Sequence, residues 1–176
     1  LDQAQLDSGK LQLSARPFEP REVLGSVCAQ LSILAEAKEL EFNYSIDENM
    51  PISIVGDSQR LKQILVNLIS NAIKFTEVGR ITVNIAVLPS NTEWIMQVID
   101  TGPGIPEESL GNFFEPFKQL ANAHKSLRKG YGLGLSIARQ LIRLMGGNIS
   151  PESALGKGTT FTITLPLVVE TEDSDE

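Results

Sequence analysis

Two strand-like segments follow each other in the middle of the chain with no helix between them. Residues 79–88 and 92–100 alternate apolar and polar side chains around the turn-rich sequence PSNT, which predicts a β-hairpin. Segments with helical periodicity flank this hairpin at residues 57–75 and 133–147. A doubly wound parallel sheet requires strict alternation of strands and helices, and the hairpin breaks that alternation. We therefore expect an α/β fold, a two-layer sandwich in which helices cover one face of a mixed sheet.

The remaining segments fit this plan. A helix is expected over residues 20–38, after the prolines at 17 and 20, and a short helix over 107–114. Further strands are expected over residues 40–47, 51–57 and 158–167. Residues 115–132 form a long connection with weak periodicity, and connections of that length in compact domains are usually functional.

The composition limits the classes of function. The chain has 176 residues, 41% of them hydrophobic, so it can bury a full core, and no apolar run has the roughly 18 residues that span a bilayer. We expect a domain that is not membrane-embedded. The net charge of −7 argues against nucleic acid as a partner, because phosphate contact requires a basic surface. The single cysteine, Cys28, has no partner for a disulfide, so we expect a small buried side chain and a cytoplasmic location.

The predicted helix that begins after Asp57 carries an unusual polar stripe. Asn67, Asn71 and Lys74 fall within an arc of roughly 60°, opposite an apolar face. Such a stripe is also what the solvent-facing side of an ordinary surface helix looks like. Asparagine is nevertheless a poor helix former, and its carboxamide oxygen is a ligand that suits Mg²⁺. A lysine one turn further along would meet a phosphate.

Three glycine clusters follow this helix. DTGPGIP begins at Asp100 at the end of a strand, GYGLGL precedes the last helix, and GKGTTF leads into the last strand. Glycines allow close approach of the backbone to a flat ligand, and a glycine-rich helix start presents N–H groups to phosphates. Taken alone, DTGPGIP and GKGTTF are better explained as ordinary turns, and each of the three clusters is a weak signal. The spacing matches neither a P-loop nor a dinucleotide-binding fingerprint.

The order of these motifs resembles one known family. The sequences DSQRLKQILVNLISNAIKFT, DTGPGI, FFEPF, GYGLGLS and GKGTTF resemble the N, G1, F, G2 and G3 boxes of the ATP-binding catalytic domain of sensor histidine kinases. That domain belongs to the superfamily that includes gyrase, Hsp90 and MutL, and the resemblance covers residues 17–167. It implies the Bergerat ATP-binding fold with ATP and Mg²⁺ as cofactors.

The resemblance also implies a role for each matching residue. Asn71 and Asn67 would hold Mg²⁺, Lys74 would meet phosphate, and Asp100 would recognise the adenine amino group. The other expected ATP-binding residues are Phe75, Gly102, Gly104, Ile105, Phe114, Phe117, Tyr131, Gly132, Leu133, Gly134, Leu135 and Thr160. Residues 115–131 would form the ATP lid.

The flanking segments are interpreted by the same resemblance. Residues 1–16 would be the end of the second helix of a dimerisation domain with its connector, and residues 168–176 an acidic linker. In a hybrid kinase such a linker would lead to a receiver domain. The phosphoacceptor histidine would lie on the dimerisation domain, because the only histidine, His124, falls in the lid. The expected partners are therefore the protein's own dimerisation domain in a homodimer and a response regulator or receiver domain. The sequence leaves open an inner-membrane anchor.

The sequence favours phosphoryl transfer over hydrolysis. Hydrolytic members of the superfamily place a glutamate base one turn before the magnesium asparagine, and here that position is Asn67, which cannot take a proton at neutral pH. The expected enzyme is a protein-histidine kinase that transfers the γ-phosphate to a histidine and then to a response regulator. Tyr131 and Lys129 depart from the usual G2 pattern. They keep open an alternative, a degenerate domain with weak or no ATP binding that regulates another kinase by direct interaction.

Overall fold

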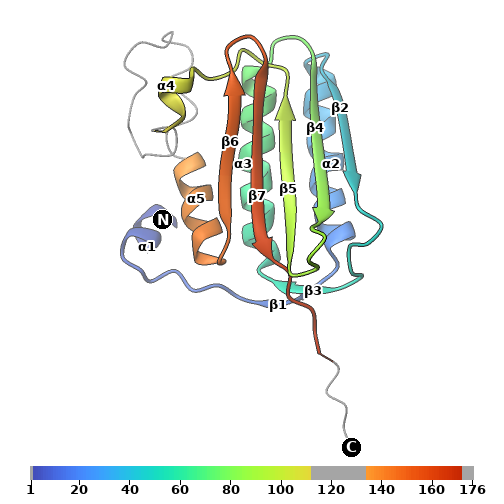
Figure 1. The fold of residues 1–176 in the computed structure, drawn as a ribbon, viewed down its shortest axis with the longest axis vertical. Helices are drawn as coiled ribbons and strands as arrows, with labels where there is room; N and C mark the ends of the chain where they lie inside the picture. Colours follow the sequence, from blue (N-terminus) through green and yellow to red (C-terminus); the bar gives the residue numbers. More distant parts are fainter. Residues whose placement is uncertain (1, 112–133, 172–176) are drawn as a thin grey trace, which may run out of the picture.

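A five-stranded sheet forms the centre of the molecule. The computed structural model describes residues 2–111 and 134–171. The strand order is β2 (Glu41–Ile46), β4 (Arg80–Val87), β5 (Glu93–Asp100), β7 (Gly158–Pro166) and β6 (Asn148–Ala154) (Figure 1). The first two strands pair in parallel, and all the other neighbours are antiparallel. The predicted mixed sheet and its hairpin, β4–β5, are confirmed.

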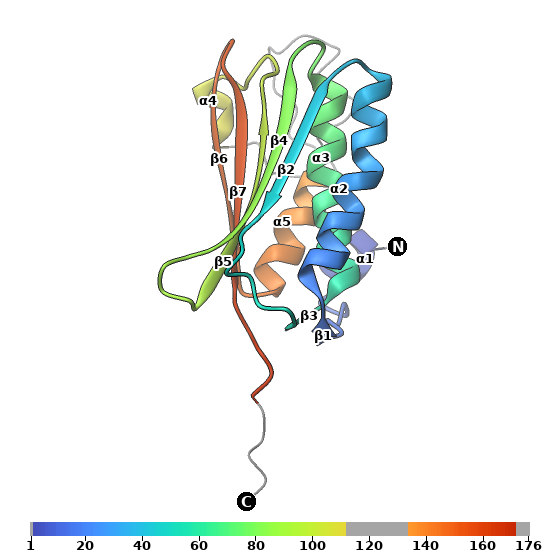
Figure 2. The same cartoon turned by 90° about the vertical axis from the view of Figure 1, so that its right-hand side faces the viewer.

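Three helices cover one face of this sheet. They are α2 (Pro20–Ala37), α3 (Ser58–Phe75) and α5 (Gly134–Leu144), and Figure 2 shows them in a single layer on the same side. The inward side chains of the strands alternate with outward ones, and the core lies between the two layers. The predicted two-layer sandwich is therefore confirmed. Cys28 lies in this core, fully buried, and burial raises the pKa of its thiol to about 12.

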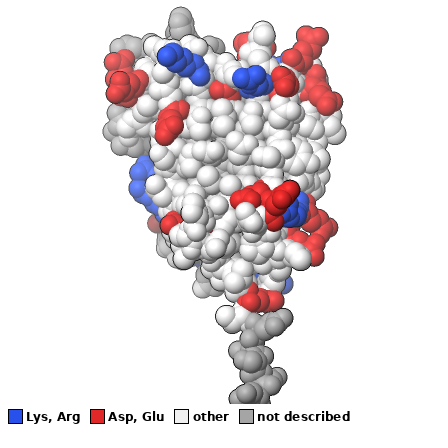
Figure 3. All heavy atoms as spheres, turned by 45° about the vertical axis from the view of Figure 1, so that its right-hand side comes forward, with Lys and Arg blue, Asp and Glu red and all other residues white. Residues whose placement is uncertain are grey.

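On the other face of the sheet, no helix of residues 2–111 and 134–171 lies over the strands, and the exposed side chains there are mostly uncharged (Figure 2 and Figure 3). Across the three central strands, β-register aligns Thr82, Ile99 and Thr160 in one row and Asn84, Gln97 and Thr162 in the next. These side chains are partly exposed. In Figure 3 most of the acidic and basic residues lie around the rim of the visible surface rather than in its centre.

Three strands, β1 (Arg16–Phe18), β3 (Ile54–Gly56) and β6, differ from the sequence-based expectation. β6 was not predicted, because its sequence NISPESA contains Pro151 and few β-formers; it occurs at the edge of the sheet, where proline is tolerated. The segment 51–57 supplies only β3, which pairs with β1 in a separate two-stranded sheet.

The N-terminal segment packs on the domain. Helix α1 (Asp2–Asp7) lies beside α5, Leu6 packs against the core, and Leu11 is buried. Gly9, with a φ of 67°, follows α1. The assignment of residues 1–16 to a dimerisation domain stays a prediction. Within the described residues, no helix combines the length and the apolar character that crossing a membrane requires.

Candidate functional site

Helix α3 orients the predicted asparagines because its apolar face is buried. The Asp57 side chain caps its N-terminus by accepting a hydrogen bond from Arg60 N at 3.2 Å. Seven residues of the helix are buried, namely Leu61, Ile64, Leu65, Leu68, Ile69, Ala72 and Ile73. Asn67 and Asn71 are half-buried and lie at the margin of that face.

Asn67 connects α3 to the start of α5. Its Nδ2 donates a hydrogen bond to the carbonyl oxygen of Gly134 at 3.2 Å. A Cβ at Gly134 would lie 3.7 Å from Asn67 Cγ, at ordinary van der Waals distance, so the start of α5 packs against the Asn67 side chain. The N box and the described end of the G2 box, which are 67 residues apart in the sequence, are thus in direct contact.

The next turns of α3 carry the other predicted side chains. Asn71 makes no side-chain hydrogen bond to any residue in the described part of the chain, so its carboxamide oxygen can accept a ligand. Lys74 is exposed, and its Nζ lies 5.4 Å from the centroid of the half-buried Phe75 ring. The helix therefore presents a neutral oxygen ligand and a cation on successive turns.

Asp100 ends β5 as a buried carboxylate. Its exposed fraction is 9%, and its Oδ1 accepts a hydrogen bond from Gly102 N at 2.9 Å. Burial raises the pKa of Asp100 above its ordinary value, and backbone hydrogen bonds from Gly102 and Thr159 partly oppose that increase. Burial makes the ionised form of Asp100 less stable, so one further hydrogen-bond donor from a ligand would stabilise it.

The glycines beside Asp100 are required by close backbone contacts. Gly104 has a φ of 75°, and a Cβ there would lie 2.1 Å from the Ala154 carbonyl oxygen. Gly158 has a φ of 83°, and a Cβ there would lie 2.0 Å from the carbonyl oxygen of Asp100. Ile105 is buried, and its N–H donates to Ser153 Oγ at 2.7 Å. The G1 loop is thus fixed against β6 and the start of β7.

Sequence reasoning missed Thr76, the residue that follows α3. It is fully buried, yet its Oγ1 has no hydrogen-bond partner among the described residues. A Cβ at Gly102 would lie 3.0 Å from this oxygen and 3.0 Å from Asp100 Oδ1, so the two oxygens flank the same small space. A buried hydroxyl without a partner is costly, and here it lies beside the carboxylate predicted to meet a ligand. Thr76 is the last residue of the N-box sequence, but that resemblance assigned it no role.

The structure does not bring Thr160 to this site. Thr160 pairs with Ile99 on the uncovered face of the sheet, whereas Thr159 pairs with Asp100 and is buried on the helical side. Successive side chains on a strand point to opposite faces, so Thr159 is the threonine next to Asp100. Its Oγ1 lies 2.9 Å from Ser153 Oγ.

The remaining predicted residues are of two kinds. The side chain of Leu135 is fully buried in the core, which leaves only its backbone for ligand contact. Six predictions lie outside the described residues, namely those for Phe114, Phe117, Tyr131, Gly132, Leu133 and the lid at 115–131. No cluster of three or more His, Cys, Asp or Glu side chains that would hold a metal occurs within residues 2–111 and 134–171. The asparagine oxygens of α3 are candidate ligands for Mg²⁺, which usually keeps several waters and binds substrate phosphates.

The fold and the site define a class: an α/β sandwich in which α3 carries half-buried asparagines, contacts the start of α5 at Gly134 and ends beside the buried Asp100 at the end of β5. The family model described as "Histidine kinase-, DNA gyrase B-, and HSP90-like ATPase" matches residues 56–169. The chain therefore belongs to this family.

Individual relatives agree with this assignment. The chain is 38% identical over 167 residues to the sensor histidine kinase RcsC of Salmonella typhimurium, covering 95% of this chain and 17% of RcsC. The crystal structure of full-length ShkA in complex with AMPPNP superposes with a TM-score of 0.84 at 30% identity, covering 97% of this chain and 35% of that one. The catalytic domain of histidine kinase ThkA superposes with a TM-score of 0.72 at 30% identity, covering 87% of this chain and 97% of ThkA's. The chain thus spans about a fifth of the length of curated relatives such as RcsC.

Proposed function

We propose that this chain is the catalytic domain of a two-component sensor histidine kinase and that it binds Mg·ATP between α3, the G1 loop and the start of α5. One observation carries the proposal: the buried carboxylate of Asp100 and the buried hydroxyl of Thr76, which has no partner in the described part of the chain, lie on either side of the space next to Gly102. An adenine edge offers both a donor and acceptors, so it would satisfy both groups. The AMPPNP in the ShkA structure supports a nucleotide as the ligand.

The residues present also fit Mg²⁺. The carboxamide oxygen of Asn71 is a neutral hard ligand, and Mg²⁺ is commonly bound through one or two protein oxygens together with substrate phosphates. In this proposal Asn71 holds the cation with support from Asn67, and Lys74 meets a phosphate as a point charge. Bound Mg·ATP supplies the γ-phosphate, and the domain contributes mainly by positioning it and neutralising its charge.

Asn67 supports transfer rather than hydrolysis. A carboxamide cannot act as a general base for water, and the Nδ2 group of Asn67 already donates to Gly134 O. A glutamate at this position would bring an anionic oxygen toward that carbonyl. The acceptor of the phosphoryl group is then a histidine on a dimerisation domain, which passes it to a response regulator. We place this catalytic domain in the cytoplasm, as part of a homodimer. In a hybrid kinase, the full-length protein would also contain an inner-membrane segment and a receiver domain.

A transfer assay with radiolabelled ATP tests this function. We expect no stable label on the present chain alone, because its only histidine, His124, is not the acceptor. We expect label on the histidine of a chain that contains the dimerisation domain when the two are mixed or joined. Steady phosphate release without labelling would instead indicate a hydrolytic ATPase, and failure to bind ATP would favour the degenerate regulatory domain.

A further inference from the structure

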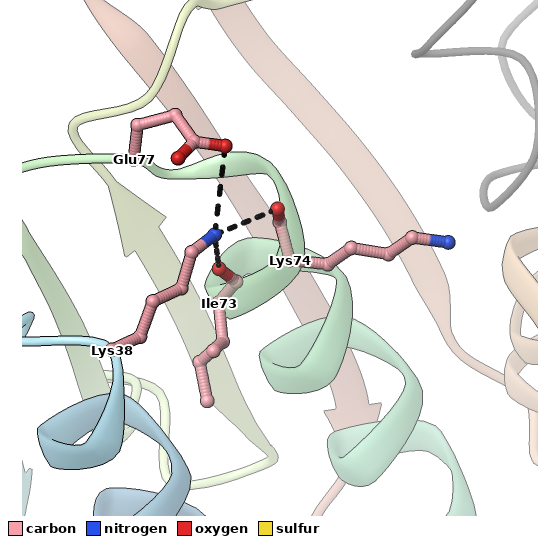
Figure 4. Close-up of polar contacts among 4 residues, drawn as sticks. All are labelled: Lys38, Ile73, Lys74 and Glu77. Carbon is pink, nitrogen blue, oxygen red and sulfur yellow. Dashed lines mark hydrogen bonds and ion pairs between the residues drawn. The ribbon is translucent and has the colours of Figure 1, made fainter.

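The last turn of α3 is held by a side chain from another helix. Lys38, the residue that follows α2, donates hydrogen bonds from Nζ to the carbonyl oxygens of Ile73 at 2.8 Å and Lys74 at 2.9 Å (Figure 4). Its Nζ also lies 3.8 Å from Glu77 Oε1. None of the five motifs includes Lys38.

This contact solves a local problem at the helix terminus. Many helices end at a left-handed glycine that satisfies the last carbonyl groups, but the residue that follows α3 is Thr76, with an extended φ of −90° and ψ of 115°. The Thr76 N–H satisfies only the Ala72 carbonyl. The ammonium of Lys38 supplies donors to the next two carbonyls, and its charge complements the negative end of the helix dipole.

The same contact holds the backbone of Lys74 in place, and the Lys74 side chain extends from that backbone. In Figure 4, Lys38 approaches the Lys74 carbonyl from one side, and the Lys74 side chain extends to the other side, away from Lys38. The Lys74 ammonium is exposed and makes no ion pair with any acidic residue of the described part of the chain. Its position therefore depends on the helix turn that carries it and on the adjacent Phe75 ring.

We propose that Lys38 is a positioning residue that holds the last turn of α3 so that Lys74 meets the phosphates of bound ATP. This inference rests on the proposed function, because it requires nucleotide at the α3 site. The hydrogen bonds to the two carbonyls carry the effect. The contact with Glu77 contributes little, because Glu77 is 86% exposed and surface ion pairs are weak.

A double-mutant cycle on Mg·ATP affinity, measured by calorimetry, tests the proposal. We expect Lys38→Met to weaken binding about 5- to 10-fold, and Lys74→Met to weaken it at least as much. Because Lys38 acts through Lys74, the double variant is expected to bind within about two-fold of Lys74→Met. Lys38→Arg, which keeps a cationic donor, is expected to recover most of the affinity.

Two controls separate this role from a purely structural one. Lys62→Met removes an exposed lysine near the start of the same helix, and Glu77→Gln removes the ion pair; both are expected to bind within two-fold of the wild type. A lower melting temperature of Lys38→Met with unchanged affinity would show that Lys38 is only a helix cap. The proposal would also be overturned if the affinity losses of the two single variants multiplied in the double variant, or if Lys74→Met left the affinity unchanged. Absence of binding by the wild-type chain would overturn the proposed function first and this inference with it.

Discussion

At the scale of single residues, the candidate site depends on two buried oxygens, Asp100 Oδ1 and Thr76 Oγ1, on either side of the space next to Gly102. Asp100 was predictable because it ends an alternating strand just before a glycine-rich turn. The choice between Thr159 and Thr160 was not, because two adjacent threonines carry the same chemistry and a shift of one residue exchanges the faces of a strand. Thr76 was missed because its importance comes from burial without a partner, which only the packed structure reveals.

Substitution of Asp100 separates ligand recognition from stability. Asp100→Asn is expected to weaken ATP binding about 10- to 150-fold, since a hydrogen bond to a charged group contributes about 1.5–3 kcal/mol. Because burial raises the pKa of Asp100 in the fold, its ionised form costs stability at neutral pH when no ligand is bound. The neutral variant is therefore expected to unfold at the same or a higher temperature without nucleotide. A clear loss of melting temperature would mean that misfolding caused the weaker binding.

Gly104 and Gly156 provide a matched pair for testing the G1 loop. Both have positive φ, 75° and 76°, but a Cβ at Gly156 would meet nothing within 4 Å, whereas one at Gly104 would overlap the Ala154 carbonyl. Gly156→Ala is expected to cost about 1–2 kcal/mol of the free energy of unfolding, from its left-handed backbone alone. Gly104→Ala is expected to cost about 1–3 kcal/mol more, from overpacking. Urea denaturation measures both, and equal losses would contradict the close contact described here.

At the scale of helices and strands, the elements with the clearest hydrophobic periodicity were the ones predicted from the sequence. The strands of the hairpin and the three helices of the layer have clear periodicity because one side of each is buried. β6 has no such pattern, since it is a polar edge strand that forms by pairing with β7. The pairing of β1 with β3 likewise depends on residues far apart in the sequence.

The end of β2 is joined to β4 by a carboxylate whose contribution depends on pH. Asp47 Oδ1 accepts from Asn49 N at 2.9 Å and Oδ2 from Val87 N at 3.2 Å, and these backbone hydrogen bonds lower the pKa of Asp47. A lowered pKa in the fold gives stability that is complete above the ordinary aspartate pKa of about 3.9 and is lost as the pH falls through the folded-state value.

The variant Asp47→Asn tests this pH dependence, because an amide can accept only one of the two bonds. It is expected to lower the melting temperature at pH 7. The difference in melting temperature between Asp47→Asn and the wild type is expected to become smaller as the pH approaches about 3. Glu48→Gln, at the exposed neighbouring residue, serves as the control. A difference that stays constant between these pH values would show that the charge of Asp47 does not stabilise this junction.

At the scale of the whole molecule, the fold assembles one site from segments that are distant in the sequence. The helical layer brings α3 and α5 together, and the sheet places the end of β5 next to the start of β7. The chain spans only 17% of a relative such as RcsC, so the proposed relay from ATP to histidine to response regulator requires segments outside this domain. The central claim about this domain itself is narrower: it binds Mg·ATP at the site that Asn71 and Asp100 define.

Isothermal titration of the chain with ATP in the presence and absence of Mg²⁺ tests that claim most directly. We expect saturable binding of one ATP per chain that strengthens with Mg²⁺, and we expect Asn71→Ala to abolish the Mg²⁺-dependent part while the fold stays intact by circular dichroism. No detectable binding of Mg·ATP by the wild-type chain, or unchanged Mg²⁺-dependent binding by Asn71→Ala, would contradict the account.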